Sequence, residues 1–322
     1  MKRREFIALL SGAAAAVWPI AARAQQSNYR LGVLTGRSRE EPNFVAFFEE
    51  LRRLGIVEGQ QLIVDVRGFK TREDRYPALA LALVSAGVDA ILAAGDAAIA
   101  AAQAATRAIP IVGISDDMVG AGFVRSLARP GGNITGVSIL ATELNSKRLE
   151  LLMDALTDAR RIAVLSDSRI TTPKHLSILR YAAQSRDAVL TVYEASTPEE
   201  IAPAIEAADK AGAQALNVLA SPLFSFNSQE IVNKVASLRL PAIFQWPEIA
   251  EQGGLLAYGP RITQTYQQMA RQLIRLIRGA KMVDTPVEQP TVFELLANLK
   301  TARAMNLQLP EGFLTRADGI IE

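Results

Sequence analysis

The stretch from Ile109 to Ser138, IPIVGISDDMVGAGFVRSLARPGGNITGVS, constrains the fold of this chain most strongly. It opens with a nearly all-apolar run, 109–114, which is typical of a strand covered on both faces of a parallel sheet. A polar loop follows, and the apolar spacing after it predicts a helix over 119–127, with Asp117 as its cap. A proline and two glycines then precede a second apolar strand over 134–139. Ligands of open α/β sheets bind where such loops leave the carboxyl ends of strands.

The same alternation of strands and helices runs along most of the chain. One series begins with a strand over 29–34, and a second begins at 161 after a long helix over 143–156. In the second series, Thr197 and Glu200 form a capping box that marks a helix start. Repeated βαβ units imply parallel sheets. With 322 residues, 49% of them apolar, we predict an α/β protein of two Rossmann-like lobes with a ligand cleft between them.

Two scarce residue types exclude several kinds of site. The chain has no cysteine, which rules out disulfides, thiolate metal sites and cysteine nucleophiles. Its single histidine, His175, rules out a metal site built on several histidines, and we expect it to be an exposed residue at a helix start. The sequence also lacks a dinucleotide-binding glycine motif, a P-loop lysine and a nucleophile elbow. We therefore predict a binding protein without cofactor or metal, not an enzyme.

The first 24 residues have the features of an export signal. A basic start at 2–4 and an apolar stretch over 6–20 precede an A-x-A cleavage site at 22–24. The residues over 3–7, RREFI, resemble the twin-arginine motif. An N-terminal membrane anchor is the alternative, but the apolar stretch is shorter than the ~20 residues that span a bilayer. We predict a periplasmic protein whose signal is cleaved after Ala24.

Removal of the signal changes the charge of the protein. The segment carries four basic residues and one acidic residue, so the formal charge of +2 becomes −1. The remaining chain has no clustered basic stripe, which makes a nucleic-acid partner unexpected.

From Asp117 the chain reads DMVGAGFVRSLARPGGNITGVS, which resembles the D-P-V-G-A-G-x-V-x-S-L-A-R-P-G-G-N-x-T-G-x-S run of tryptophan/tyrosine-type ABC-transporter substrate-binding proteins. Met118 stands where that family usually has proline. The segments 253–260 and 286–322 are similar to the family's C-terminal signature. The resemblance implies a type I periplasmic binding protein with three crossovers and hinge closure. Its lobes would comprise 28–140 plus 255–285, and 141–254 plus 286–322.

Polar and aromatic side chains stand at the carboxyl ends of the expected strands in both lobes. Loops that converge from two lobes without a reactive group form a binding cleft. Helix capping is the alternative role of Asp96 and Asp117, and core packing that of Trp246. The predicted ligand-binding residues are Thr35, Arg37, Gly95, Asp96, Ser115, Asp116, Ser166, Asp167, Ser221, Gln245, Trp246 and Tyr258.

The predicted contacts indicate a class of ligand. Arg37, with the hydroxyls of Thr35 and Ser115, would hold a carboxylate, and Asp116 or Asp167 would accept an ammonium group. Both groups together favour an aromatic or branched amino acid or a related carboxylate. We predict the solute-binding component of an ABC importer, with the permease, its ATPase and the export machinery as partners. The alternative is a periplasmic sensor subunit that reports the solute to a membrane receptor.

Overall fold

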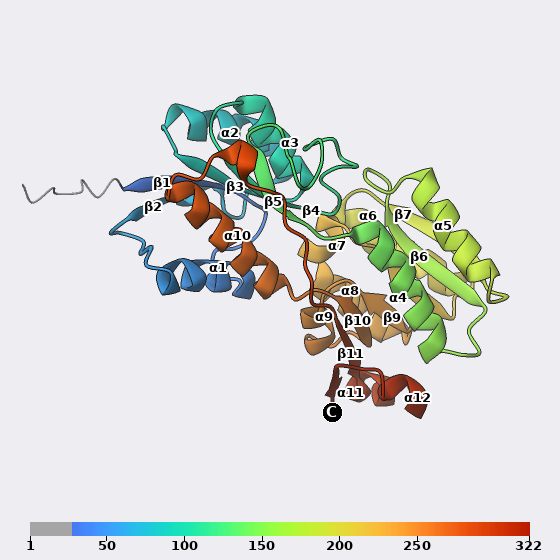
Figure 1. Ribbon diagram of the computed structural model, residues 1–322. Coiled ribbons are helices and arrows are strands. Elements are labelled where there is room, and N and C mark those ends of the chain that lie inside the picture. Colours follow the sequence, from blue (N-terminus) through green and yellow to red (C-terminus); the bar gives the residue numbers. More distant parts are fainter. Residues whose placement is uncertain (1–27) are drawn as a thin grey trace, which may run out of the picture.

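The computed structural model describes residues 28–322, so the predicted signal over 1–24 lies outside the described residues. Two lobes lie side by side, and each consists of a sheet with helices on both faces (Figure 1). The chain passes between the lobes three times, as the resemblance implied. The C-terminus lies in the second lobe.

The first lobe contains a five-stranded parallel sheet in the order β2-β1-β3-β4-β5. Successive side chains of a strand point to opposite faces, and Leu31 and Leu34 of the first strand accordingly belong to different cores. Helices α1 and α10 pack together over one core, while α2 and α3 pack over the other. The elements are β1 (Tyr29–Leu34), α1 (Pro42–Arg53), β2 (Leu62–Asp65), α2 (Tyr76–Ser85), β3 (Ala90–Ala94), α3 (Asp96–Ala105), β4 (Ile111–Ser115), β5 (Ile134–Ser138) and α10 (Ile262–Ile277).

The second lobe contains a seven-stranded sheet in the order β12-β11-β10-β9-β8-β6-β7. Its strands pair in parallel except for β10 and β11, which are antiparallel. The strands are β6 (Arg161–Asp167), β7 (Val189–Ala195), β8 (Ala215–Val218), β9 (Ala242–Phe244), β10 (Leu256–Gly259), β11 (Glu294–Asn298) and β12 (Gly319–Ile321). The helices are α4 (Ala141–Ala155), α5 (Pro173–Gln184), α6 (Pro198–Lys210), α7 (Pro222–Phe226), α8 (Ser228–Leu238), α9 (Pro247–Glu251), α11 (Leu299–Ala304) and α12 (Glu311–Leu314). Short 3-10 turns occur at η1 (Val66–Gly68), η2 (Glu73–Arg75) and η3 (Met282–Asp284).

One lobe boundary differs from the expected position. We expected 255–285 in the first lobe, but β10 pairs with β9 and β11 and so belongs to the sheet of the second lobe. The chain crosses after Gly259, and only α10 and η3 of this stretch accompany the first sheet. On the return path, Glu288 adds a parallel bridge beside Val137 at the edge of the first sheet.

Most of the expected elements are present, including the strand over 29–34 and the capping box at Thr197. The expected helix over 119–127 is wrong, because that segment consists of turns and bends. Asp117 Oδ1 accepts hydrogen bonds from the amides of Val119 and Gly120, as a cap would. Gly122 then adopts a φ of 76°, which ends the single turn. Two glycines within four residues make a longer helix unfavourable.

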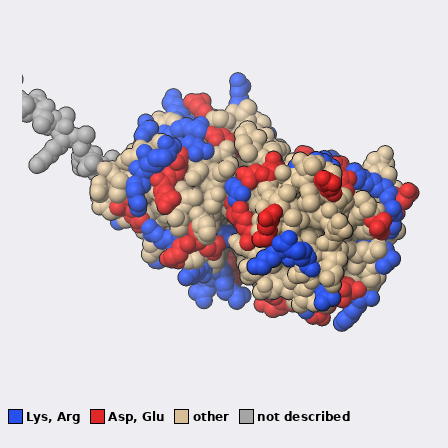
Figure 2. Space-filling view, turned by 90° about the horizontal axis from the view of Figure 1, so that it is seen from below, with Lys and Arg blue, Asp and Glu red and all other residues tan. Residues whose placement is uncertain are grey.

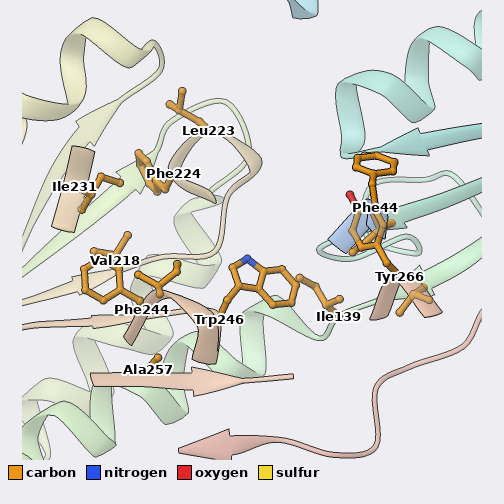
Figure 3. Packing of buried hydrophobic residues seen from close by; sticks show 14 of the residues in the cluster. Phe44, Ile139, Val218, Leu223, Phe224, Ile231, Phe244, Trp246, Ala257 and Tyr266 are labelled. Atoms are coloured by element: carbon orange, nitrogen blue, oxygen red, sulfur yellow. The ribbon is translucent and has the colours of Figure 1, made fainter. Parts of the chain in front are cut away.

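A single apolar cluster extends across both lobes. Figure 3 shows Trp246 of the second lobe beside Ile139, with Tyr266 and Phe44 of the first lobe beyond it. Trp246 is only 4% exposed. Over the face in Figure 2, basic and acidic residues are interspersed on both lobes, so this face carries no large field of one sign.

Candidate ligand-binding site

A small cavity lies between the lobes, where β3 and β4 of the first sheet end opposite the loops that follow β8 and β9 of the second. Its volume is about 40 Å³. Apolar and aromatic side chains form most of its wall: Ala94, Ile114, Ile139, Pro222, Phe226, Trp246, Ile262 and Tyr266. One water needs roughly 10–15 Å³, so this cavity has room for only a few waters.

A second, wider cleft shares Asp116 with the small cavity. Its volume is about 610 Å³, which falls within the usual range of ~300–1,000 Å³ for ligand pockets. The first lobe contributes Asp96 and Asp117 to its wall, and the second lobe contributes the start of α5 together with Asn145 and Ala220. The two spaces therefore give an apolar compartment and a polar compartment that meet at Asp116.

Within the described residues, Asp116 forms no ion pair with a basic side chain. Burial, followed by the neighbouring charge of Asp96, raises the pKa of Asp116 to about 7, while Arg148 and Gln245 act in the opposite direction. Burial also raises the pKa of Asp96, and the charge of Asp117 adds to that effect. Within residues 28–322, Asp116 Oδ2 and Asp96 Oδ1 are buried without a hydrogen-bond partner. Such groups are costly unless something binds them.

The guanidinium of Arg37 lines the small cavity but is engaged by protein groups. Its Nη1 donates to Glu41 Oε2 at 2.5 Å, and its Nη2 donates to the hydroxyl and the carbonyl of Ser225 at 2.8 and 3.1 Å. The group also lies 4.9 Å from the ring centre of Phe226. Ser225 belongs to the second lobe, so Arg37 joins the lobes across the cavity.

A second contact between the lobes lies at the rim of the cleft. Arg169 binds Asp167 through two nitrogens, and its Nη1 donates to Glu73 Oε2 of the first lobe at 2.9 Å. Asp167 also accepts a hydrogen bond of 2.7 Å from Ser221. The carboxylate of Asp167 is thus saturated by protein groups, unlike that of Asp116. Together with those of Arg37, these contacts link the two lobes directly.

The structure brings most of the twelve predicted residues to the cleft. Arg37, Gly95, Ser115, Asp116, Ser221, Gln245 and Trp246 line the small cavity, and Asp96 lines the wider cleft. The other four are held elsewhere: the hydroxyl of Thr35 accepts from the amide of Arg37, Ser166 and Asp167 are buried, and the ring of Tyr258 faces Phe293. Asp96 makes no capping hydrogen bond, because Gly95 is the N-cap of α3.

With this geometry in place, comparison with known proteins identifies the family. The sequence model of the family described as "ABC transporter substrate binding protein" matches residues 42–321. The chain belongs to this family. Members are substrate-binding proteins of ABC transporters and not enzymes.

Individual relatives agree with this assignment. A tyrosine-binding protein of Clostridioides difficile is 26% identical over 267 residues, which cover 81% of this chain and 76% of that protein. An ABC domain from Streptococcus pneumonia, solved in complex with L-Trp, has a TM-score of 0.82 at 22% identity and covers 92% of this chain and 100% of its own. A ligand-free, open substrate-binding protein with adhesive properties from Clostridium difficile has a TM-score of 0.63 at 20% identity, covering 91% and 99%. The fold is that of type I periplasmic binding proteins.

Two further observations concern the described part of this substrate-binding protein. Within residues 28–322, no helix combines the length and the hydrophobicity that a membrane crossing requires. The same residues contain no cluster of three or more side chains suited to a metal ion.

Several residues of the cleft were not predicted from the sequence. Ser225 and Phe226 lie on α7, because the expected loop after β8 continues as a short helix. Asn145 lines the polar compartment from α4, and Arg148 of the same helix lies buried behind it. The position of Arg148 was a usable signal, since it falls on the apolar face of α4 between Leu144 and Leu151.

The expected exposure of His175 is wrong. His175 lies in the first turn of α5 as expected, with Thr172 as the cap of the helix. Its side chain, however, is only 8% exposed. Its Nε2 lies 3.3 Å from Asn145 Nδ2, and burial lowers its pKa. The packing of α5 against α4 accounts for this burial, which a pattern within one helix does not reveal.

Proposed function

We propose that this chain is the periplasmic solute-binding component of an ABC importer and that it closes on a small organic ligand carrying an ammonium group and an apolar part. An aromatic or branched amino acid is the ligand class. The observation that carries the proposal is the meeting of two compartments at Asp116, with unpartnered carboxylate oxygens beside an aromatic wall. Relatives described as tyrosine-binding and as an L-Trp complex support the amino-acid class.

The ammonium group would bind between the lobes at Asp96 and Asp116. A cation there neutralises carboxylates that burial otherwise makes costly, and charge-assisted hydrogen bonds are the stronger kind. The apolar part would enter the space walled by Trp246 and Tyr266. Because that space holds only a few waters in the described form, the side chains that wall it must move apart to hold an aromatic ring.

The carboxylate of an amino acid would compete for Arg37. In the described form this guanidinium is committed to Glu41 and Ser225, so a ligand carboxylate gains it only by replacing the contacts to Ser225. The ligand would then take over the link between the lobes. Closure by population shift would follow, because a ligand that touches both lobes favours the closed form that the permease recognises.

The proposed function in import requires that the protein lies outside the cytoplasm. The signal over 1–24 supports export, with cleavage after Ala24, and the permease, its ATPase and the export machinery are the implied partners. A small ligand that is released to a permease needs no cofactor in this site.

Binding measurements on purified protein test the ligand class. L-tryptophan, L-tyrosine and L-leucine are titrated calorimetrically beside their deaminated acids and their decarboxylated amines. We expect the compounds with an ammonium group to bind and their deaminated analogues to bind at least tenfold more weakly. Asp116→Asn should weaken binding by about 10- to 100-fold, the range for a charge-assisted hydrogen bond. Because the pKa of Asp116 is raised to about 7, affinity should increase as the pH rises from 6 to 8.

Asp89→Asn is the control for this experiment. Asp89 is an exposed carboxylate of the first lobe that lines neither compartment, and its Oδ2 accepts a hydrogen bond from the amide of Arg30 that an asparagine retains. Its affinity should remain within about twofold of the wild type. Equal or tighter binding of the deaminated acids would contradict an ammonium site at Asp116.

A further inference from the structure

Arg148 is the largest side chain that is fully buried in the described chain, at 0% exposure. Its Nη1 donates to the carbonyl of Tyr258 at 3.0 Å, and its Nη2 donates to Asn145 Oδ1. Within residues 28–322, no carboxylate lies at ion-pair distance from the guanidinium, and its Nε has no acceptor. A buried cation without an ion pair is unfavourable, so its presence requires compensation elsewhere.

The hydrogen-bonding network of Arg148 reaches the wall of the polar compartment. Asn145 Oδ1 also accepts from the amide of Ala220 at 3.0 Å, and Asn145 Nδ2 lies 3.3 Å from His175 Nε2. Asn145, His175 and Ala220 all line the wider cleft together with Asp116. Arg148 therefore lies one residue behind that wall, and Tyr258 ties it to the chain just before the crossing into α10.

Among the charged groups that act on Asp116, Arg148 is the cation that favours its ionised form. Asp96 faces Asp116 from the start of α3, Asp167 from the end of β6, and Gln245 from the loop after β9. Asp167 is already paired with Arg169. Of the other titratable groups, Asp117 lies beside Asp96, Tyr258 and His175 lie beside Arg148, and Glu143 lies beside His175. Lys174 lines the same cleft from the start of α5.

Each of the two buried charges supports the other. Arg148 lowers the pKa of Asp116 against the larger effect of burial, and Asp116 raises the pKa of Arg148, which burial lowers to about 9. Loss of the guanidinium would remove the only cation among the described residues that lowers the pKa of Asp116 and would leave Gln245 to act against the charges of Asp96 and Asp167. The protonated form of Asp116 would then prevail over a wider pH range.

We propose that Arg148 is a positioning residue for ligand binding, which holds Asp116 in its ionised, ammonium-accepting form and fixes the cleft wall through Asn145. This inference rests on the proposed function, because it assumes an ammonium-bearing ligand at Asp116. It adds a residue that need not touch the ligand and that sets the pH range over which the ligand binds.

The test compares the pH dependence of binding in charge-removing and charge-retaining variants. L-tryptophan, with L-leucine as a second probe, is titrated into the wild type, Arg148→Met and Arg148→Lys between pH 6 and 9. We expect Arg148→Met to bind more weakly at pH 6 to 7, by tenfold for each unit that the pKa of Asp116 rises, and to approach the wild type at pH 9. Arg148→Lys should lie closer to the wild-type profile.

Lys147→Met is the matched control, since Lys147 is the adjacent cation on α4 but pairs with Glu150 on the partly exposed side. It should bind as the wild type does at every pH. A constant loss of affinity in Arg148→Met from pH 6 to 9 would overturn the proposal, because packing alone has no such pH dependence. Should Arg148→Met fail to fold, Arg148→Gln removes the charge and keeps a donor for Tyr258.

The carboxyl titration of Asp116, followed by 13C NMR, separates this inference from the proposed function. An upward shift of its pKa in the charge-removing variant supports the role of Arg148 without any ligand, and an unchanged pKa overturns it. If neither probe nor any other ammonium compound binds the wild type, the proposed function fails, while the titration still decides on Arg148.

Discussion

The raised pKa of Asp116 links the proposed ligand binding to the stability of the fold. This pKa is raised to about 7, so the folded protein holds this proton more tightly than the unfolded chain does. The contribution of this group to stability therefore declines as the pH rises from the unfolded value of about 3.9 toward 7. A cationic ligand reverses the decline, because it replaces the proton with a charge that is bound only in the folded state. The raised pKa thus points to a site built for an occupant.

Glu50 shows the opposite behaviour, and it provides a prediction about stability. Hydrogen bonds from Arg53, and then from Arg271, lower the pKa of this carboxylate from 4.5 to about 2 and join α1 to α10. The stabilisation is complete above the unfolded pKa and disappears as the pH falls from 4.5 toward 2. Glu50→Gln should cost about 1 kcal/mol near pH 7, because both arginines are partly exposed. Urea unfolding of both proteins between pH 2 and 7 measures this.

The comparison with an exposed ion pair completes that experiment. Glu58 pairs with Arg39 at the surface, and Glu58→Gln should change stability by less than about 0.5 kcal/mol at any pH. A difference between Glu50→Gln and the wild type that persists at pH 2 would show that packing, and not the charge, is the cause.

At the scale of elements, strong periodic patterns in the sequence predicted the local structure well. They did not predict the backbone conformation at glycines. The apolar run before Ser115 and the capping box at Thr197 each determine a local structure, and both are present. The segment 119–127 has helical spacing of its apolar residues, but Gly122 occupies the left-handed region and no helix forms. The spacing of apolar residues indicates which side chains are buried, not the backbone conformation that buries them. Val124 is buried in this turn, as it would be in a helix.

Gly136 gives the prediction at this scale. It lies within β5 at a φ of 139°, and a Cβ there would lie 1.8 Å from the carbonyl oxygen of Gly113 on β4. Gly136→Ala must push the strands apart, at a cost of about 1–3 kcal/mol or more. Gly132→Ala is the control, since a Cβ there meets nothing within 4 Å. Thermal unfolding should show a clearly lower Tm for the first variant and a Tm near that of the wild type for the second.

At the scale of the molecule, the sequence predicted two lobes and the loop ends that face the cleft, but not the contacts across it. Side chains such as Arg37 and Ser225 are 188 positions apart, and no local pattern records their pairing. The position of β10 depends on its pairing with β9 and β11. A pattern within one segment of the sequence does not reveal this pairing either. The same long-range pairing buries Arg148 against Tyr258.

The contacts between the lobes predict how easily the ligand-free protein opens. Glu73–Arg169 and Arg37–Ser225 join the lobes without a ligand, so removing the first and the hydroxyl contact of the second should shift the ligand-free population toward open forms. Glu73→Gln combined with Ser225→Ala should raise the radius of gyration of the ligand-free protein in small-angle scattering. A saturating ligand should restore the wild-type value. Affinity should fall by the factor by which the closed population falls, because the ligand must then supply that free energy.

Glu150→Gln serves as the control for this last prediction, because it removes an ion pair that lies wholly within the second lobe. Its scattering profile and its affinity should match those of the wild type. An unchanged radius of gyration in the double variant, with affinity also unchanged, would mean that the apolar contact of Trp246 with Ile139 and its neighbours holds the lobes closed by itself. Trp246→Ala would then be the variant that opens them, since it removes a side chain that belongs to the core on both sides of the cleft.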